Sequence, residues 1–324
     1  MAPIPNRRVV LYHYMSSPHS KVLVWYLTLR KIPYYQCLQS NTPLSPDLTQ
    51  NLGIAYRRIP ILCIGRDVYV DLDFILKKLE QLFPESEAHP SVKGYGSNHY
   101  NTIEWLFRGT VSDSGLFEFL LDHADVVGSK IHEDIRNVPA SFSLETIRAK
   151  RPEAASAVRW YMHFMLETTF LADGRNWLGN TDGPSLLDLE AIWPLYWLYT
   201  IPGALPAEFI DRAQLPKVFA WIERFKPFVE AKQAQWPPQT LKSSQAVAAI
   251  MTAPFAEEEG DVMATELNLL KGEQVKMSPK GWGGWNKDTG KLVSLDETQI
   301  VIETKATHGS VRVHAPTGLF CVGR

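Results

Sequence analysis

The most informative segment of this chain is residues 8–30, RVVLYHYMSSPHSKVLVWYLTLR. Its apolar start, Arg8–Tyr14, predicts a buried strand, and Lys21–Arg30 predicts a helix. Between the two, Ser17 is a good N-cap, and Pro18 suits the first helical turn because proline lacks the amide donor that would be unsatisfied there. The free amides and the dipole of such a helix favour an anion just beyond its N-terminus, and they lower the pKa of a thiol placed there.

The same serines have a simpler interpretation, in which both only cap a helix. The ligand interpretation adds a hydroxyl hydrogen bond from Ser16 to a bound sulfur. No cysteine occupies positions 16–20, so that sulfur would have to arrive with a ligand. Cys37 and Cys63 lie in apolar runs and are predicted to be small core residues.

Farther along, Ile59-Pro60-Ile61-Leu62 opens another apolar run. A proline at this place is compatible with a cis peptide bond, or with a trans proline that merely begins a strand. A hydroxyl pair at a helix start together with this proline predicts a thioredoxin-like domain that binds a thiol.

Composition excludes several classes of protein. The 324 residues include 45% hydrophobic and 21% charged residues, which is typical of globular domains, and the formal net charge is −2. That balance argues against a nucleic-acid or polybasic membrane surface. Three scattered cysteines predict neither a disulfide framework nor a zinc site, and no metal is expected. With no apolar leader or membrane span in the sequence, we expect a cytoplasmic protein.

Changes in pattern along the chain predict three parts. Residues 1–86 alternate strand and helix signals, which indicates an α/β thioredoxin-like domain. Residues 92–238 contain helical patterns and no convincing strand, which indicates an all-α helical bundle. Residues 245–324 contain short β-rich runs separated by turn residues, among them Asp288-Thr289-Gly290, and predict a small β-rich accessory domain.

Taken together, these motifs resemble the cytosolic glutathione transferases. Ser16-Ser17-Pro18 is similar to the serine motif of the delta class, and the serine pair is also similar to the zeta class. Ile59-Pro60-Ile61-Leu62 resembles the family's Val/Ile-Pro-x-Leu, and Ser185-Leu186-Leu187-Asp188 resembles its Ser-x-x-Asp box. In that box we expect Ser185 to cap a helix and the Asp188 side chain to return to the Ser185 amide. The resemblance covers about residues 8–235.

The resemblance implies glutathione as co-substrate and a set of site residues. Ser16 would hydrogen-bond the glutathione sulfur, with Ser17 second and Tyr12, at the end of the first strand, a lesser candidate. Arg58, Ile59, Pro60, Asp71 and Leu72 would bind the peptide. Trp105, Phe107, Arg108 and Phe117 would line the pocket of a hydrophobic electrophilic substrate, or else only pack between helices.

One position departs from the family pattern. Where the family has Glu/Gln-Ser, this chain has Asp71-Leu72. Asp71 can still receive the ligand amine. Leu72 offers no hydroxyl to the γ-glutamyl carboxylate, although its backbone N–H is expected to remain at a helix start. The loss of such a bond costs about 1.5–3 kcal/mol. Either Asp73 or another group compensates, or glutathione is not the natural ligand. Arg57 and Arg58 would suit a ligand carboxylate, or are solvated surface residues.

The part after residue 240 lies outside ordinary family members and resembles an extra domain of fungal transferase-like proteins linked to secondary metabolism. Its Trp282, Trp285 and His314 either line a second pocket or pack in a core.

Three functions are therefore open: addition of the glutathione thiolate to an electrophile, glutathione-dependent cis–trans isomerisation, and a repurposed glutathione-independent or non-catalytic binding role. The family resemblance also implies a homodimer.

Overall fold

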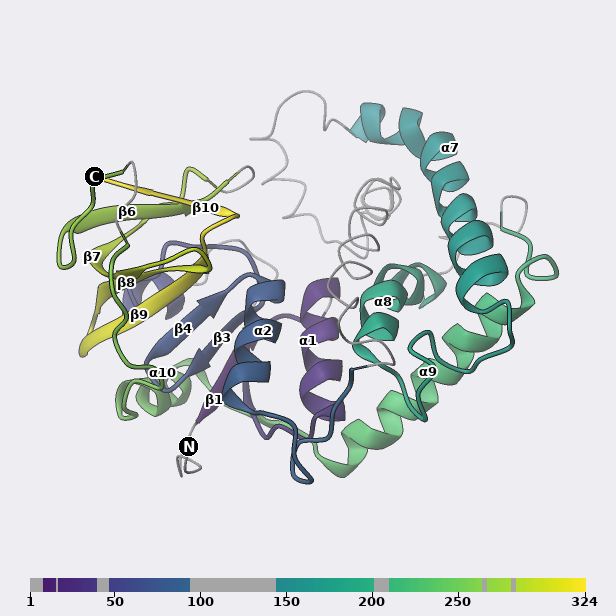
Figure 1. The fold of residues 1–324 in the computed structure, drawn as a ribbon, viewed down its shortest axis with the longest axis horizontal. Helices are drawn as coiled ribbons and strands as arrows, with labels where there is room; N and C mark the ends of the chain where they lie inside the picture. Colours follow the sequence, from purple (N-terminus) through teal and green to yellow (C-terminus); the bar gives the residue numbers. More distant parts are fainter. Residues whose placement is uncertain are drawn as a thin grey trace. The chain divides into compact units, whose positions relative to one another are not determined.

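The computed structural model describes residues 8–15, 17–39, 47–93, 144–200, 210–263, 267–280 and 284–324. Contacts divide the chain into two compact units. The first unit contains residues Met1–Leu23, Pro33–Pro84 and Pro238–Arg324, and the second contains Val24–Ile32 and Glu85–Pro237. The predicted accessory domain at 245–324 therefore belongs to the same unit as the thioredoxin-like part (Figure 1).

The N-terminal part has the predicted alternation of strands and helices. Its elements are β1 (Val9–His13), α1 (Pro18–Leu29), β2 (Tyr35–Leu38), η1 (Asp47–Asn51), β3 (Ile61–Ile64), β4 (Asp67–Val70) and α2 (Leu72–Leu82). β1 pairs parallel with β2 and antiparallel with β3, and β3 forms a hairpin with β4. The hairpin turns at Gly65, whose φ of 59° is a conformation that favours glycine. This is the thioredoxin-like arrangement that the sequence predicts.

The C-terminal part adds further strands to the same sheet. Its elements are β5 (Gln239–Thr240), α10 (Ser243–Met251), β6 (Gln274–Pro279), β7 (Asp288–Leu295), β8 (Gln299–Ala306), β9 (Gly309–Pro316) and β10 (Phe320–Gly323). The order of the described strands is β10-β6-β7-β8-β9-β4-β3-β1-β2-β5. β9 pairs parallel with β4, with Tyr69 opposite His314, and β5 pairs parallel with β2. The tail thus covers both edges of the thioredoxin-like sheet.

Asp288-Thr289-Gly290, which the sequence analysis assigns to a turn, lies within β7. The reason is a close approach between strands. A Cβ on Gly290 would lie 2.4 Å from the carbonyl oxygen of Glu303 on β8, so glycine is needed there for packing and not for a turn.

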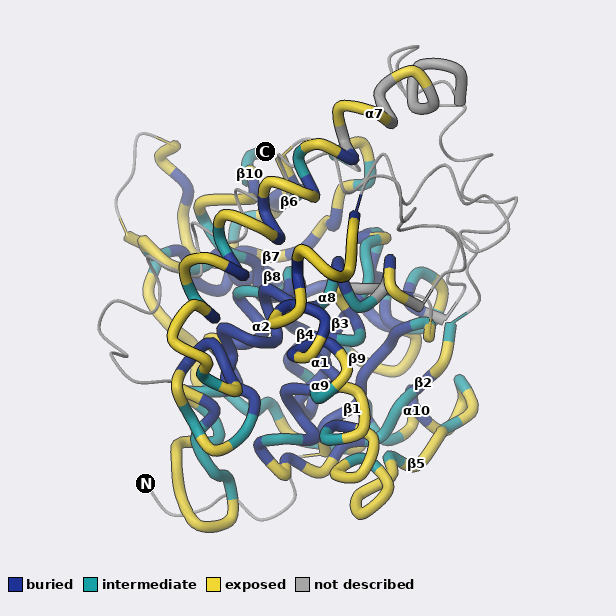
Figure 2. Tube along the Cα trace, turned by 90° about the vertical axis from the view of Figure 1, so that its right-hand side faces the viewer, coloured by how far each residue is buried: buried dark blue, intermediate teal, exposed yellow. Residues whose placement is uncertain are grey.

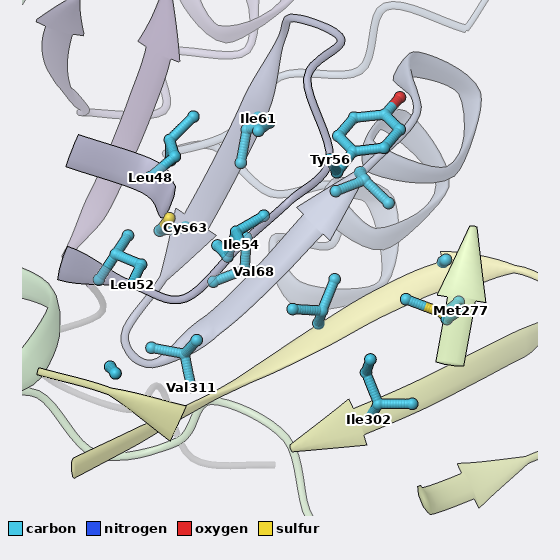
Figure 3. Packing of buried hydrophobic residues seen from close by; sticks show 14 of the residues in the cluster. Leu48, Leu52, Ile54, Tyr56, Ile61, Cys63, Val68, Met277, Ile302 and Val311 are labelled. Carbon is cyan, nitrogen blue, oxygen red and sulfur yellow. The ribbon is translucent and has the colours of Figure 1, made fainter. Parts of the chain in front are cut away.

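A hydrophobic cluster joins the N-terminal part and the tail within the first unit (Figure 3). It joins residues of the hairpin and of the segment before it, such as Ile54 and Val68, with residues of the tail, such as Met277, Ile302 and Val311. The central strands β1, β3 and β4 are buried at every position, and the strand segments are largely dark blue in Figure 2. Because each part buries its apolar side chains against the other, the tail completes this core.

The described regular elements of the second unit are helices, joined by irregular segments. Its elements are the C-terminal half of α1, then α7 (Leu144–Trp160), η3 (Tyr161–Phe170), α8 (Leu186–Thr200) and α9 (Pro216–Gln235). α8 begins at the predicted box: the Ser185 amide donates to Asp188 Oδ2 at 2.8 Å, as the sequence predicts. Asp188 Oδ1 also accepts hydrogen bonds from the Leu178 amide and Trp221 Nε1, each at 2.8 Å. None of the described helices has the length and apolar character needed to span a membrane.

Candidate functional site

Three chain segments meet at one end of the sheet. Tyr12, near the end of β1, lies opposite Ile61 at the start of β3, and Ile61 lies opposite Val70 at the end of β4. Since neighbouring strands are about 4.8 Å apart, the turn into α1, the Ile59–Pro60 bond and the turn into α2 lie within roughly 10 Å of one another in the strand-pairing direction. The sequence motifs that predict a thiol site are therefore brought together by strand register.

At the start of α1, Ser17 is the N-cap. Its side chain is buried, and its Oγ accepts a hydrogen bond from the Ser20 amide at 3.2 Å. Its own amide donates to the Tyr14 carbonyl oxygen at 3.1 Å, and its carbonyl oxygen accepts from the Lys21 amide. Ser17 thus caps the helix with an uncharged group, as its sequence position predicts. Ser16 lies outside the described residues.

Two tyrosines near the end of β1 have different environments. Tyr12 is completely buried and belongs to the hydrophobic core. Tyr14 follows β1 in the turn toward α1 and is half-buried. Burial raises the pKa of Tyr14, so its phenol stays protonated near neutral pH and can act as a hydrogen-bond donor. The sequence analysis singled out Tyr12 and missed Tyr14, whose position two residues before Ser16 was the available signal.

The peptide bond Ile59–Pro60 is cis. Pro60 is buried and Ile59 is half-buried. Of the two arginines before this bond, Arg57 is exposed, whereas Arg58 Nη2 donates to the Lys280 carbonyl oxygen of the tail at 3.4 Å. The tail therefore contacts one of the residues predicted to bind the ligand.

At the start of α2, Asp71 is the N-cap and has a φ of 75°. A positive φ is uncommon for a residue other than glycine and is often found at functional sites. Asp71 Oδ1 accepts hydrogen bonds from the Asp73 amide at 3.2 Å and the Phe74 amide at 3.3 Å. Leu72 is buried. The Asp71 carboxylate is therefore engaged with its own helix.

Tyr56 connects this helix start to the tail, and the sequence analysis missed it. Its side chain is buried, and the Asp71 carboxylate lies close enough to influence its hydroxyl. Burial and the nearby Asp71 charge raise its pKa, so it remains a neutral phenol.

On the side of the tail, the ring of Tyr56 lies 5.7 Å from the ring of Phe320 on β10. The main-chain amides of Ala55 and Tyr56 both donate to Asp288 Oδ1 on β7. No local signal in the sequence links position 56 to β7 or β10.

A polar cluster joins β4, α2 and the tail. His314 Nε2 lies 2.7 Å from Asp67 Oδ1, and both side chains are buried. Tyr69 Oη donates to Glu257 Oε1, and Lys78 Nζ donates to Glu257 Oε2, each at 2.7 Å. Such a buried network fixes how β9 docks on β4. His314 therefore lies in the interior, whereas Trp285, proposed with it for a second pocket, is 61% exposed. Trp282 lies outside the described residues.

The other predicted substrate-pocket residues, Trp105, Phe107, Arg108 and Phe117, also lie outside the described residues. Cys37 and Cys63 are buried, and burial raises the pKa of Cys63, which makes it a poor nucleophile. Within the described ranges no group of His, Cys, Asp or Glu has the arrangement of a metal site.

Comparison with known proteins agrees with this geometry. Residues 11–87 match the family model of the glutathione S-transferase N-terminal domain. Residues 126–234 match a domain of unknown function, DUF7962. A search of the curated proteins gives no match.

Among solved structures, a GST-like protein from Pseudomonas syringae has a TM-score of 0.68 at 21% identity, covering 98% of this chain and 100% of that one. The β-etherase LigF from Sphingobium sp. strain SYK-6 has a TM-score of 0.52 at 14% identity, covering 70% and 99%. Rice GST1, in complex with glutathione, has a TM-score of 0.50 at 15% identity, covering 75% and 96%.

At these identities the solved structures establish a fold of the glutathione S-transferase type and not an activity. The matches cover the rice and Sphingobium proteins almost completely, but they leave a quarter to a third of this chain unmatched. The match with the Pseudomonas protein covers nearly the whole length of both chains. The fold with the added tail therefore has a bacterial counterpart.

Proposed function

We propose that this protein is a glutathione S-transferase-like enzyme that joins the thiolate of glutathione to an electrophilic small molecule. The observation that carries the proposal is the meeting of the α1 start, the Ile59–Pro60 bond and Asp71 at one end of a transferase-type sheet. The α1 dipole and the Ser16 hydroxyl would stabilise the thiolate, with the neutral Tyr14 phenol as a second donor.

In this reaction the bound thiol loses its proton to solvent, and the sulfur electron pair forms a C–S bond with the electrophile. The displaced electron pair leaves with a leaving group or is taken up with a proton from water. The main chain at Ile59 would pair with the extended peptide, and Asp71 would face its amino group. Arg58 and Pro60 would form the wall of the same groove.

The two adjacent serines give a matched test. Ser16→Ala should lower turnover of glutathione with 1-chloro-2,4-dinitrobenzene roughly tenfold to a hundredfold, because it removes a hydrogen bond to a charged sulfur. Ser17→Ala should instead lower the free energy of unfolding by about 1 kcal/mol, because it removes a helix cap. Steady-state kinetics and urea denaturation of both variants separate the two effects. Unchanged turnover in Ser16→Ala would remove this serine from the mechanism.

A glutathione-independent role is the second candidate, and the engaged Asp71 carboxylate with the apolar Leu72 favours it. Titration calorimetry with millimolar glutathione tests it directly, since absence of binding would support this role. If turnover occurs, the mass of the product distinguishes conjugation, which retains sulfur, from isomerisation, which does not.

The setting of the reaction rests on the sequence resemblance. We propose a cytoplasmic homodimer that acts in secondary metabolism, with a hydrophobic electrophile as second substrate. Membership of a fungal transferase-like subgroup is proposed on the same resemblance.

A further inference from the structure

The segment that leads to the Ile59–Pro60 bond packs on strands of the tail. Residues 53–58 form no helix or strand, so their main-chain groups need partners outside a regular ladder. The Thr304 hydroxyl on β8 donates to the Gly53 carbonyl oxygen at 3.2 Å. A Cβ on Gly53 would overlap the Lys305 carbonyl oxygen of the same strand, so the two main chains touch there. The tail thus provides the surface on which this irregular segment lies.

Asp288, the first residue of β7, binds the next part of the segment. Its Oδ1 accepts hydrogen bonds from the amides of Ala55 and Tyr56. Its own main chain is fixed by pairing with Met277 on β6. The carboxylate is buried, and burial raises its pKa to about 6, so the ionised form costs stability at neutral pH. A carboxylate that is unfavourable in the fold, yet bonded to the segment before the cis bond, favours a role in the site.

These amides lie close along the chain to the groups proposed to bind the ligand. Ile59, whose main chain would pair with the extended peptide of glutathione, follows Tyr56 by three residues. Between the two, Arg58 Nη2 donates to the carbonyl oxygen of Lys280, the residue after β6, at 3.4 Å. The Tyr56 ring also packs beside Phe320 on β10. The four residues before Ile59 therefore contact the tail at three places.

We propose that Asp288 is a positioning residue of the thiol site, whose carboxylate holds the Ala55 and Tyr56 amides so that the Ile59 main chain stays where glutathione pairs with it. The inference rests on the proposed glutathione transfer and adds the tail to the ligand site. Binding is tightest when the segment is already in place, because the apparent dissociation constant rises as the binding-competent fraction of the protein falls. In this role Asp288 acts through main-chain groups and not by contact with the ligand.

Two substitutions of Asp288 on the full-length protein test this role. Asp288→Ala removes the acceptor of both amides, so the dissociation constant and the KM for glutathione should rise by about tenfold or more. The kcat at saturating glutathione should change by less than about threefold, because the start of α1 is unaltered. Asp288→Asn keeps an oxygen acceptor and should bind glutathione as the parent does. Titration calorimetry gives the affinity, and steady-state kinetics with 1-chloro-2,4-dinitrobenzene gives KM and kcat.

Leu295→Ala is the matched control, at the opposite end of the same strand. Leu295 is buried in the hydrophobic cluster, so this substitution should lower the urea midpoint of unfolding but leave glutathione binding unchanged. If Asp288→Ala does not fold, Thr304→Val tests the same segment, because it removes the hydroxyl that donates to Gly53. Its affinity for glutathione should fall about threefold, and an unchanged affinity would contradict the proposal.

The outcomes separate this inference from the proposed function. If Asp288→Ala binds glutathione as tightly as the parent, the positioning role is wrong and the transferase function stands. An equal loss of affinity in Leu295→Ala would assign the effect to overall stability, and an equal loss in Asp288→Asn would assign it to the charge. Either result would overturn the positioning role. A parent that binds no glutathione would instead overturn the proposed function, and this inference with it.

Discussion

Asp188 shows how one carboxylate can organise a helix start. Its two oxygens accept hydrogen bonds from the Ser185 amide and hydroxyl, from the Leu178 amide and from the Trp221 indole. Burial raises the pKa of Asp188, and these four donors oppose the rise by stabilising the charged form. The bond to Ser185 could be predicted from the Ser-x-x-Asp spacing, but the bonds to Leu178 and Trp221 could not.

We therefore expect Asp188→Ala to destabilise the helical unit. The substitution leaves buried donors without a partner, and each such donor costs about 1–3 kcal/mol, so the free energy of unfolding should fall by roughly 3 kcal/mol or more. Urea denaturation followed by circular dichroism measures the loss. Asp182→Ala, at an exposed position nearby in the sequence, should have almost no effect. An equal midpoint for the two variants would contradict the role assigned to Asp188.

At the scale of elements, β7 fixes the segment before the Ile59–Pro60 bond. Its first residue, Asp288, is buried, and burial raises its pKa from 3.8 to about 6 even though two amides donate to Oδ1. Asp288 Oδ2 has no hydrogen-bond partner among the described residues. The ionised Asp288 carboxylate binds the amides of Ala55 and Tyr56, but burial of its charge lowers the free energy of unfolding.

The raised pKa predicts a pH dependence with a definite sign. Because the folded chain binds the Asp288 proton more tightly than the unfolded chain, this group lowers stability as the pH rises from about 4 to about 6. Asp288→Asn keeps the Oδ1 acceptor and removes the charge. The variant should therefore gain stability relative to the parent at pH 7.5, by up to about 3 kcal/mol, and the gain should shrink near pH 4.

Chemical denaturation of the parent and the Asp288→Asn variant at both pH values measures this difference. Asp261→Asn, which makes the same charge change at an exposed position of the tail, is the control and should leave the free energy of unfolding almost unchanged. If the parent is more stable than Asp288→Asn at pH 7.5, the ionised carboxylate stabilises the folded chain and the prediction is wrong.

At the scale of the molecule, the tail is an extension of the N-terminal sheet and shares its core. β4 would otherwise be an edge strand with unpaired main-chain groups, and β9 covers it. The buried pair of Asp67 and His314 crosses the same seam. The tail thus belongs to the structure that shapes the ligand end of the sheet.

Cleavage of the connection tests this integration without removing any residue. A protease site inserted between Trp236 and Pro237, which are exposed, cuts the chain before the tail. We expect residues 237–324 to stay bound after cleavage, because buried apolar surface and strand pairing hold them. Gel filtration of the cleaved protein in native buffer shows whether the tail elutes with the rest of the chain. The same experiment in urea is the control, in which the two pieces should separate. Separation of the tail in native buffer would show that it folds independently.

The sequence by itself determined the local elements and the thioredoxin-like half, because strand and helix periodicity, the Ser17 cap and the Ser185–Asp188 box depend on neighbours a few residues apart. It also pointed to Asp71 and Leu72 as a departure. Only the tertiary structure decided that β9 joins β4, that Asp288 and Phe320 hold Tyr56, and that Asp71 closes its own helix. These contacts join residues that are far apart in the chain, and they are selected by complementary edges, buried area and charge, which leave no periodic trace in the sequence.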